Sequence, residues 1–412
     1  MKTFSVDRIR KDFSFFEQQR PYIFFDSAAT TQKPRQVIDR LAYFYSYEVA
    51  SVFRGIYRAS ERATALYEQA RKTVASFIGA HTHEIIFTAG ATDSINMVAL
   101  SWARHVIRAG DEIMVSQLEH NANFIPWQQL AQSCGARLVI VPIMADGQLD
   151  MAVFEKLLSP KTRLVAITHV SNVLGVLVDI NKVITQAHAV GARVLVDATQ
   201  SVPHRRINVH ELGADFLVFS GHKMLGPTGI GVLFVRAELH ESMQPYRYGG
   251  GMAREVYLDR SVWAPVPAML EAGSPPVAQA IGLAEAINYL SAIDFDQLIT
   301  HEAQLTRMLI TGLQSFKRIR ILGPVDQLMN HGHMVTFTIE GTCAPGIHAH
   351  DVAAFLDAQQ PAIAISAGKQ CAHTVYAALG VAAAVRISFY LYNTPEEVAL
   401  LLKNIEQLFT VL

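Results

Sequence analysis

Short apolar runs alternate with helical patterns along the first part of the chain. The runs are bounded by polar turns and rich in Val, Ile and Phe, which is typical of buried strands. They cover residues 22–25, 84–87, 112–115, 137–141, 164–167, 194–196, 216–219 and 229–235. Helical periodicity is predicted between them, at residues 34–47, 64–78 and 183–190. This alternation predicts an α/β fold with a mostly parallel sheet covered by helices on both faces.

The pattern changes after the last of these runs. Residues 248–251 and 271–276 read as Gly- and Pro-marked loops, and helices are predicted at 277–293, 295–316, 352–356 and 395–409. Strands are predicted at 333–339, which alternates as an antiparallel strand does, and at 385–390. We therefore predict a large domain at residues 21–290 and a smaller α+β domain at 291–412. Residues 1–20 form a short amphipathic helix in this prediction, which packs on the small domain.

Composition limits the class of protein. The chain has 412 residues, of which 50% are hydrophobic and 17% charged, so it can bury a core larger than one typical domain. The formal net charge is −1 and the basic residues are scattered, which argues against nucleic acid or an anionic membrane as the main partner. No apolar run approaches the ~18 residues that span a bilayer, and the N-terminus lacks the apolar core of a secretory signal. We expect a cytoplasmic protein.

The three cysteines are too few and too far apart for a disulfide framework or a zinc site. Cys371 lies between polar residues in a Gly-containing loop, which is typical of a reactive thiol rather than a structural one. Cys134 lies beside a turn and Cys343 in a polar loop, and neither has such support. We predict no catalytic role for these two and no metal site.

The stretch from Asp197 to Lys223 carries the main candidate chemistry. One predicted strand stops at Asp197, and another stops at Ser220-Gly221-His222-Lys223. Ligands of open α/β sheets bind at the carboxyl ends of strands, so both residues are expected in one cleft. Pyridoxal 5'-phosphate (PLP) requires a lysine for its Schiff base and a carboxylate for its pyridine nitrogen. The alternative is that Asp197 caps a helix and Lys223 is a solvated surface charge.

Neighbouring residues favour the cofactor over that alternative. Gln200 follows the acid closely enough to donate to the phenolic oxygen of the ring, and Ser220 and His222 stand beside the lysine as phosphate ligands. Residues 88–94 form a small turn that contains Ala91 and Thr92 and opens a helix, an arrangement that holds phosphate.

Two further segments are candidates for contacts with a ligand. The turn at residues 26–30, which contains Ala28, consists of small residues that let a backbone approach a ligand closely. Residues 51–58 contain Arg54, which has no obvious helical partner. We predict that Ala28 and Arg54 contribute to substrate binding.

Together these motifs resemble the PLP-dependent cysteine desulfurases of the SUF-type, group II branch of the class V aminotransferases. The resemblance covers essentially the whole chain, and its most specific part is the lysine segment, residues 219–223 followed by 226–231. Supporting segments are residues 26–29, 54–56, 119–127, 169–172, 271–273 and 392–394.

The resemblance implies a homodimeric enzyme of PLP fold type I. In it His120 stacks on the ring, Thr92, Ser220 and His222 hold the phosphate, and Ser274 reaches the phosphate of the partner subunit. Asn172 and Arg386 bind the substrate carboxylate. Arg386 also fits this role without the family, because its planar guanidinium suits a carboxylate, although an arginine in a strand is often an ordinary surface residue.

The implied reaction converts L-cysteine to alanine. Lys223 moves the Cα proton, and the Cys371 thiolate attacks the substrate sulfur to give a persulfide. The sulfur then passes to a dedicated acceptor protein, with iron–sulfur cluster assembly as the expected pathway. A free thiol is mostly protonated at neutral pH, so the loop must lower its pKa or pass its proton to a neighbour.

The departures from the family gather near this cysteine. Ser366 replaces an arginine, while Lys369 and Gln370 replace histidines. Phe53 and Asn121 also occupy places where histidine is common. These changes keep open two alternatives: a selenocysteine lyase or cysteine sulfinate desulfinase, and a PLP-binding partner without catalytic activity.

Overall fold

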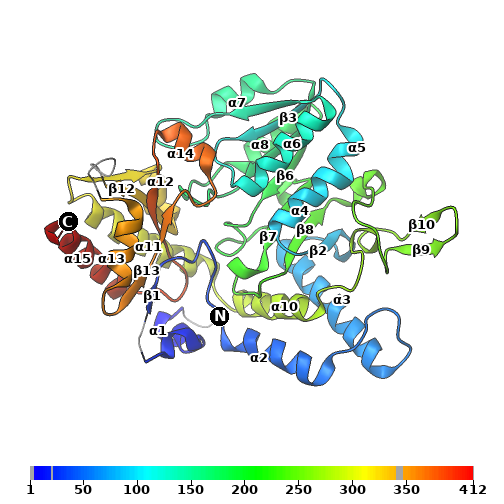
Figure 1. Cartoon of the computed structure of the whole chain (residues 1–412), viewed down its shortest axis with the longest axis horizontal. Coiled ribbons are helices and arrows are strands. Elements are labelled where there is room, and N and C mark those ends of the chain that lie inside the picture. Colours follow the sequence, from blue (N-terminus) through cyan, green and yellow to red (C-terminus); the bar gives the residue numbers. More distant parts are fainter. Residues whose placement is uncertain (1–3, 20–21, 340–346, 412) are drawn as a thin grey trace.

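The computed structural model describes residues 4–19, 22–339 and 347–411. Figure 1 shows a large sheet layered between helices on the right and a smaller sheet with its own helices on the left. The helix α14 (His373–Leu379) lies between the two parts. No described helix is both long and apolar enough to cross a membrane.

The large sheet has seven strands in the order β2-β8-β7-β6-β5-β3-β4. Only β8 runs antiparallel to its neighbours, so the prediction of a mostly parallel sheet is confirmed. The strands are β2 (Ile85–Thr88), β3 (Glu112–Ser116), β4 (Arg137–Val141), β5 (Thr162–Thr168), β6 (Arg193–Asp197), β7 (Phe216–Ser220) and β8 (Gly231–Val235).

Both faces of this sheet are buried, which explains why its strands read as continuous apolar runs. Successive side chains of a strand point to opposite faces. In β7, Phe216 and Val218 join one core cluster, while Leu217 and Phe219 join the other. Residues of the helices α4 (Ala91–Val98) and α6 (Ile125–Cys134) belong to the first cluster. Residues of α3 (Arg58–Ile78), α8 (Ile180–Ala189) and α10 (Val277–Ser291) belong to the second.

The helices of this part include long covering helices and short turns. They are α2 (Arg35–Tyr43), α3 (Arg58–Ile78), α4 (Ala91–Val98), α5 (Arg104–Val106), α6 (Ile125–Cys134), α7 (Met151–Leu157), α8 (Ile180–Ala189), α9 (Val209–Leu212) and α10 (Val277–Ser291). The helix α3 ends at Gly79, which adopts a left-handed φ of 69° that glycine tolerates without a steric penalty.

The smaller part has a four-stranded antiparallel sheet in the order β11-β12-β15-β14. Its strands are β11 (Ile319–Leu322), β12 (Met334–Ile339), β14 (Ser366–Gly368) and β15 (Ala384–Ser388). Its helices are α11 (Phe295–Leu313), α12 (Val325–His331), α13 (Ala349–Asp357), α14 and α15 (Pro395–Val411). Side chains from α11, α13, α15 and the sheet form a separate core.

The first strand differs from its expected placement. We expected residues 22–25 in the large domain, but β1 (Tyr22–Phe24) pairs in parallel with β13 (Ala362–Ala364). Ile23 and Phe25 belong to the core of the smaller part. Strand pairing between residues so far apart in sequence leaves no local periodic signal, which is why the sequence misplaced this strand.

The N-terminal segment contains less helix than predicted. Within its described residues, 4–19, the helical elements are α1 (Val6–Arg10) and a 3-10 turn, η1 (Ser14–Glu17). Arg10 donates to Tyr392 O and to the Glu397 carboxylate, both at 2.7 Å, so this segment contacts the smaller part. It also contacts α10, because Tyr289 donates to Asp12 at 2.9 Å.

A hairpin of β9 (Ala253–Val256) and β10 (Ser261–Trp263) was not predicted. It projects from the right edge of the molecule in Figure 1. Its register shifts between Val262 and Trp263, and Leu258 at its tip is fully exposed. A hairpin that contacts little of the core has a weak hydrophobic pattern, so the sequence showed only a loop region here.

Candidate active site

A cavity of about 340 Å³ lies where the ends of several strands meet the smaller part of the molecule. Most of the residues predicted from the sequence line it: Ala28, Ala91, Thr92, His120, Asn172, Asp197, Gln200, Ser220, His222, Lys223, Cys371 and Arg386. The folding of the chain therefore brings the predicted lysine, acid and cysteine to one cavity.

Lys223 and Asp197 reach the cavity from neighbouring parallel strands. Asp197 is the last residue of β6, and Lys223 ends the turn that follows β7. Burial and the nearby Arg386 guanidinium lower the pKa of Lys223 to about 8, although Asp197, Asp26 and Cys371 act against this shift. A substantial fraction of the amine is therefore neutral near physiological pH and able to act as a nucleophile or base.

His120 lies in the cavity as a neutral ring. Burial, followed by the charges of Lys223 and Arg386, lowers its pKa, while Asp197 opposes the shift. Its Nδ1 accepts a hydrogen bond from Ala122 N at 3.0 Å, which fixes the orientation of the imidazole. The ring is thus held in place by the backbone of the turn that it begins.

The N-terminus of α4 meets the end of β7 at one side of the cavity. Ala91 N donates to Ser220 Oγ at 2.9 Å, so the Ser220 hydroxyl proton is free for another acceptor. Burial, Lys223 and Lys33 lower the pKa of His222 to about 4, so its ring is also neutral. Backbone N–H groups, a hydroxyl and a neutral imidazole form a donor set that suits phosphate.

Arg386 is held by two groups on the other side of the cavity. Its guanidinium donates to Asn172 O at 2.7 Å and to Asp26 Oδ1 at 2.8 Å, and its side chain is almost fully buried. Its Nε has no hydrogen-bond partner among the described residues. A planar cation with a donor left over can bind a ligand carboxylate.

Cys371 lies in the loop between β14 and α14, and its side chain is exposed. Gln370 and Cys371 have left-handed φ values of 39° and 54°, which cost a non-glycine residue roughly 1–3 kcal/mol each. Two contacts hold the loop to the large part: Asn121 N donates to Cys371 O at 2.7 Å, and Asn172 Nδ2 donates to Gln370 O at 2.8 Å.

Polar atoms without partners indicate what the cavity can hold. Within the described part of the chain, Thr199 Oγ1, Asn172 Oδ1 and Arg386 Nε are buried and make no hydrogen bond, and all three residues line the cavity. Leaving such groups unpaired costs about 1–3 kcal/mol each, so a polar ligand is favoured. With the acid, the lysine and the donor set for phosphate, the residues fit PLP together with an amino acid.

Ser274 and Arg54 do not line this cavity. They line a separate hollow of about 1050 Å³, together with Phe53, Gly250 and Glu271. Cys134 is also absent from the cavity, and Cys343 lies outside the described residues. The single chain thus brings together most of the predicted set and places Ser274 and Arg54 elsewhere.

Two acids that the sequence analysis did not assign support the site. Asp26 holds Arg386, as described above, and burial raises its pKa. Glu119 is fully buried beneath His120 and accepts from Asn123 Nδ2 at 2.6 Å and Thr168 N at 3.0 Å. Burial raises the pKa of Glu119 to about 8. Position in sequence was the available signal, since Asp26 follows a strand and Glu119 precedes His120.

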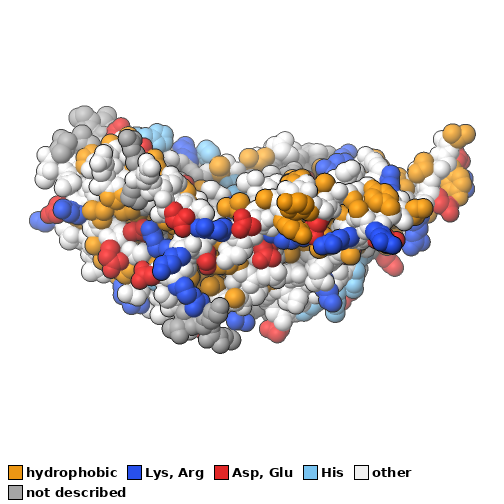
Figure 2. Space-filling view, turned by 90° about the horizontal axis from the view of Figure 1, so that it is seen from below, with side chains coloured by type: hydrophobic (Ala, Val, Ile, Leu, Met, Phe, Trp, Pro, Cys, Tyr) orange, Lys and Arg blue, Asp and Glu red, His pale blue; other side chains and the backbone are white. Residues whose placement is uncertain are grey.

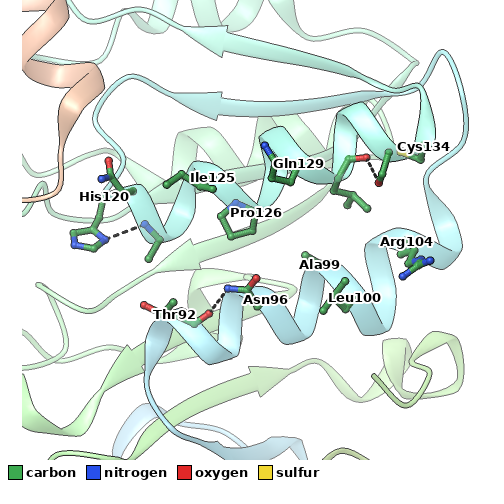
Figure 3. A pocket seen from close by; sticks show the side chains of 14 residues that line it. Thr92, Asn96, Ala99, Leu100, Arg104, His120, Ile125, Pro126, Gln129 and Cys134 are labelled. Carbon is green, nitrogen blue, oxygen red and sulfur yellow. Dashed lines mark hydrogen bonds between the residues drawn. The ribbon is translucent and has the colours of Figure 1, made fainter. Parts of the chain in front are cut away.

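A second hollow of about 810 Å³ shares Thr92, His120 and Ala122 with the cavity. It runs between α4 and α6, with His120 at one end and Cys134 and Arg104 at the other (Figure 3). Leu100 and Ile125 expose apolar surface along it. This groove connects the His120 side of the site to the surface.

Comparison with known proteins identifies the family. The aminotransferase class-V family matches residues 23–401. A probable cysteine desulfurase of Streptomyces coelicolor is 42% identical over 97% of this chain and 96% of its own, and a cysteine desulfurase of Dickeya dadantii is 42% identical over 99% and 98%. Among solved structures, the apo cysteine desulfurase of Thermococcus onnurineus superposes with a TM-score of 0.94 at 38% identity over the full length of both chains. The Escherichia coli cysteine desulfurase CsdA gives 0.91 at 36% identity, again over both full chains. The chain belongs to the class-V aminotransferase family and, within it, to the cysteine desulfurases.

Proposed function

We propose that this protein is a PLP-dependent cysteine desulfurase that uses Lys223, Asp197 and Cys371. The observation that carries the proposal is the single cavity that these three residues line. When bound, PLP supplies an electron sink for the bonds around the substrate Cα. Asp197 would hold the ring nitrogen, His120 the ring face, and the α4 N-terminus with Ser220 and His222 the phosphate.

The remaining residues act on the amino acid. Arg386 and Asn172 would bind its carboxylate, because Arg386 Nε is a donor without a partner among the described residues and Asn172 Nδ2 has a second N–H besides the one it donates to Gln370 O. Lys223, with its lowered pKa, removes the proton from Cα. Gln200 Nε2 donates to Ala28 O at 2.8 Å, and both residues line the cavity.

Cys371 performs the sulfur step. Its thiolate attacks the sulfur of L-cysteine, so that an S–S bond forms on the enzyme while the substrate C–S bond breaks, and the carbon skeleton leaves as alanine. The exposure of Cys371 supports transfer of the persulfide sulfur to an acceptor protein. Iron–sulfur cluster assembly as the destination and cytoplasmic residence remain predictions.

We further propose a homodimer. Exposed apolar side chains gather on residues 43–57 and 248–262, with Tyr47 77% and Ile56 97% exposed. Figure 2 views the molecule from below, and hydrophobic side chains are concentrated there in the region of α2, which lies at the bottom of Figure 1. Such patches are typical of subunit interfaces. Ser274 and Arg54 line the hollow beside this surface, so a partner chain could meet them there. Sedimentation analysis that finds only monomers would contradict this proposal.

Activity on selenocysteine or cysteine sulfinate is the second candidate. The observation that favours it is the composition of the Cys371 loop, where Ser366 and Gln370 line the cavity without adding a cation. Those substrates fragment more readily and depend less on the thiol. A PLP-binding protein without catalysis is the remaining alternative.

One experiment distinguishes these functions. The holoenzyme is incubated with L-cysteine, selenocysteine or cysteine sulfinate, and alanine and protein-bound persulfide are quantified. Desulfuration predicts alanine from L-cysteine with persulfide on Cys371. Alanine only from the other two substrates would favour the second candidate, and no alanine from any substrate by a protein that retains its cofactor would overturn the enzymatic proposal.

A further inference from the structure

Glu84 is a buried acid at an edge of the large sheet, at the opposite end of β2 from the turn that leads to Ala91 of the cavity. It ends the 3-10 turn η3 (Thr82–Glu84) just before β2, and its side chain is 1% exposed. Its Oε2 accepts from His81 N at 2.9 Å and lies 3.0 Å from His210 Nε2. Its Oε1 accepts from Ala237 N at 3.0 Å. The carboxylate therefore joins η3, α9 and the turn η7 (Ala237–Ser242).

Two backbone N–H groups and His210 contact this carboxylate, but no side chain of fixed positive charge pairs with it within the described ranges. Within the described ranges, the ion pairs of Glu84 include no lysine or arginine, and its single ion-pair partner is His210. A buried carboxylate without a cation is costly, so a bound cation would stabilise the arrangement.

The side chains around Glu84 are those that bind transition metals. One ligand atom each from His81, Glu84 and His210 lies within 4.8 Å of the other two. The His81 and His210 rings have centroids 5.1 Å apart and planes inclined at 51°, so lone pairs of their nitrogens can converge on one point. Both histidines are exposed, so an ion from solvent can reach them.

A second cluster of the same composition lacks this geometry. His204, Glu302 and His333 are fully buried between the two parts of the molecule. The His204 and His333 rings are stacked at 3.8 Å with an angle of 14°, so their lone pairs lie in parallel planes and cannot converge on one ion. His204 Nδ1 is instead 2.8 Å from Glu302 Oε1, as in a hydrogen-bonded pair. The two clusters differ in ring orientation rather than in residue type.

We propose that His81, Glu84 and His210 bind a divalent transition-metal ion of the Zn²⁺ class, with water completing the coordination. Imidazole nitrogens and a carboxylate oxygen suit zinc, whereas Mg²⁺ and Ca²⁺ prefer oxygen ligands alone. His210 would bind through Nε2 and carry its proton on Nδ1. The ion would join the η3 turn, which carries His81 and Glu84, to α9, which carries His210. It lies at the opposite end of β2 from Thr88, which leads to the Ala91 turn of the cavity.

The test uses the PLP-loaded full-length protein with Cys371→Ser, because the exposed thiol also binds zinc. Zn²⁺ alone is added, its stoichiometry is measured by equilibrium dialysis, and the ion is located in crystals by anomalous scattering at the zinc edge. We expect one ion at His81, Glu84 and His210. The double substitution His81→Ala with His210→Ala should abolish this ion, and Glu84→Gln should weaken binding by at least about tenfold.

The matched control is His105→Ala, which removes an exposed histidine on α5 outside the cluster and should leave the ion in place. The two histidines are on the surface, so their removal should not prevent folding; retained cofactor absorbance and an unchanged circular dichroism spectrum would verify this. Absence of anomalous density at this position overturns the proposal, as does unchanged zinc stoichiometry in a folded double variant.

Discussion

The two halves of the candidate site are built differently. The residues around Lys223 and Asp197 come from the ends of buried strands, and His120, Ser220 and Ala91 are held by hydrogen bonds within the large part of the molecule. Cys371 lies on an exposed loop of the smaller part, has a left-handed backbone, and is held through the backbone contacts at Cys371 O and Gln370 O. The cofactor half is therefore preorganised, while the cysteine half can move without unfolding a sheet.

Most of the departures from the family pattern lie in the cysteine half. Ser366, Lys369 and Gln370 belong to the segment of the cysteine loop, while Phe53 and Asn121 lie in the large part. A rigid site tolerates few changes because its groups must meet one ligand within about 0.5 Å. An exposed loop tolerates more, so substrate preference and acceptor choice can change there without loss of cofactor binding.

The largest effect is expected from Lys223→Ala. This change removes both the amine that bonds the cofactor and the base for Cα, so alanine release should fall by about 10⁴-fold or more. The lysine-dependent visible absorbance should also disappear. Lys182→Ala is the control, because Lys182 is exposed on α8 and does not line the cavity. Loss of absorbance in the control alone would contradict the assignment.

Cys371→Ser tests the cysteine half by itself. The protein should keep its cofactor absorbance, because none of the proposed cofactor contacts involves this thiol. Persulfide should vanish, and alanine release from L-cysteine should fall by about 10²-fold or more, since the nucleophile is lost. Release from cysteine sulfinate should change much less.

Cys134→Ser provides the control for that measurement, since Cys134 lies outside the cavity. It should behave as wild type with all substrates. An equal fall for L-cysteine and cysteine sulfinate in Cys371→Ser would show that the loop also supports the cofactor half, and the comparison drawn above would then fail.

Asn172→Ala should have a smaller effect, and it tests a residue of the large part that contacts the cysteine loop. It removes the hydrogen bond from Nδ2 to Gln370 O and a proposed contact to the substrate carboxylate. One such bond contributes about 0.5–1.5 kcal/mol, so kcat/KM should fall by roughly tenfold. Asn121→Ala removes only the side-chain contact with His373 at 3.1 Å and keeps the backbone donor to Cys371 O, so it should cost less. Steady-state kinetics that reverse this order would contradict the proposed role of Asn172.

The smallest expected effect is on the stability of the folded protein at acid pH, through His169 in the cofactor half. Burial, followed by the charge of Arg205, lowers the pKa of His169 to about 4, and His169 N donates to Asp197 O at 2.9 Å. The unfolded chain binds a proton at this histidine below pH ~6.5, whereas the folded protein does not. The stability contributed is therefore complete above pH ~6.5 and is lost as pH falls toward about 4, by up to about 1.4 kcal/mol per pH unit.

Thermal unfolding of the holoenzyme between about pH 7.5 and about pH 5 covers the upper part of that range and should show the loss as a falling Tm. His169→Gln should make the dependence less steep by the share of one histidine, because His222, whose pKa is also lowered to about 4, contributes in the same direction. The buried His204 and Glu302 also contribute to the pH dependence of stability, but in opposite directions. Burial lowers the pKa of His204 and raises that of Glu302, so their contributions to the pH dependence oppose each other. A Tm that does not fall with pH in the wild type would contradict the prediction.

Much of the large part was predictable because its signals are local. Each buried strand is an apolar run ended by a polar residue, and the rule that ligands meet the carboxyl ends of parallel strands was enough to place Asp197 and Lys223 together. Cys371 also carried a local signal, namely polar neighbours in a Gly-containing loop. For these residues the sequence determined the element, and the element determined the position.

Only the tertiary structure decided the features that depend on distant segments. The pairing of β1 with β13 joins an N-terminal strand to the smaller part, and a parallel bridge between Asp26 and Ser388 brings Asp26 beside Arg386 on β15. His210 of α9 likewise meets His81 and Glu84 of the η3 turn only through tertiary packing, and the different ring orientation at His204 and His333 is invisible in sequence. The physical reason is that periodicity reports which face of an element is buried, whereas side-chain direction and long-range pairing are set by the packing of the whole chain.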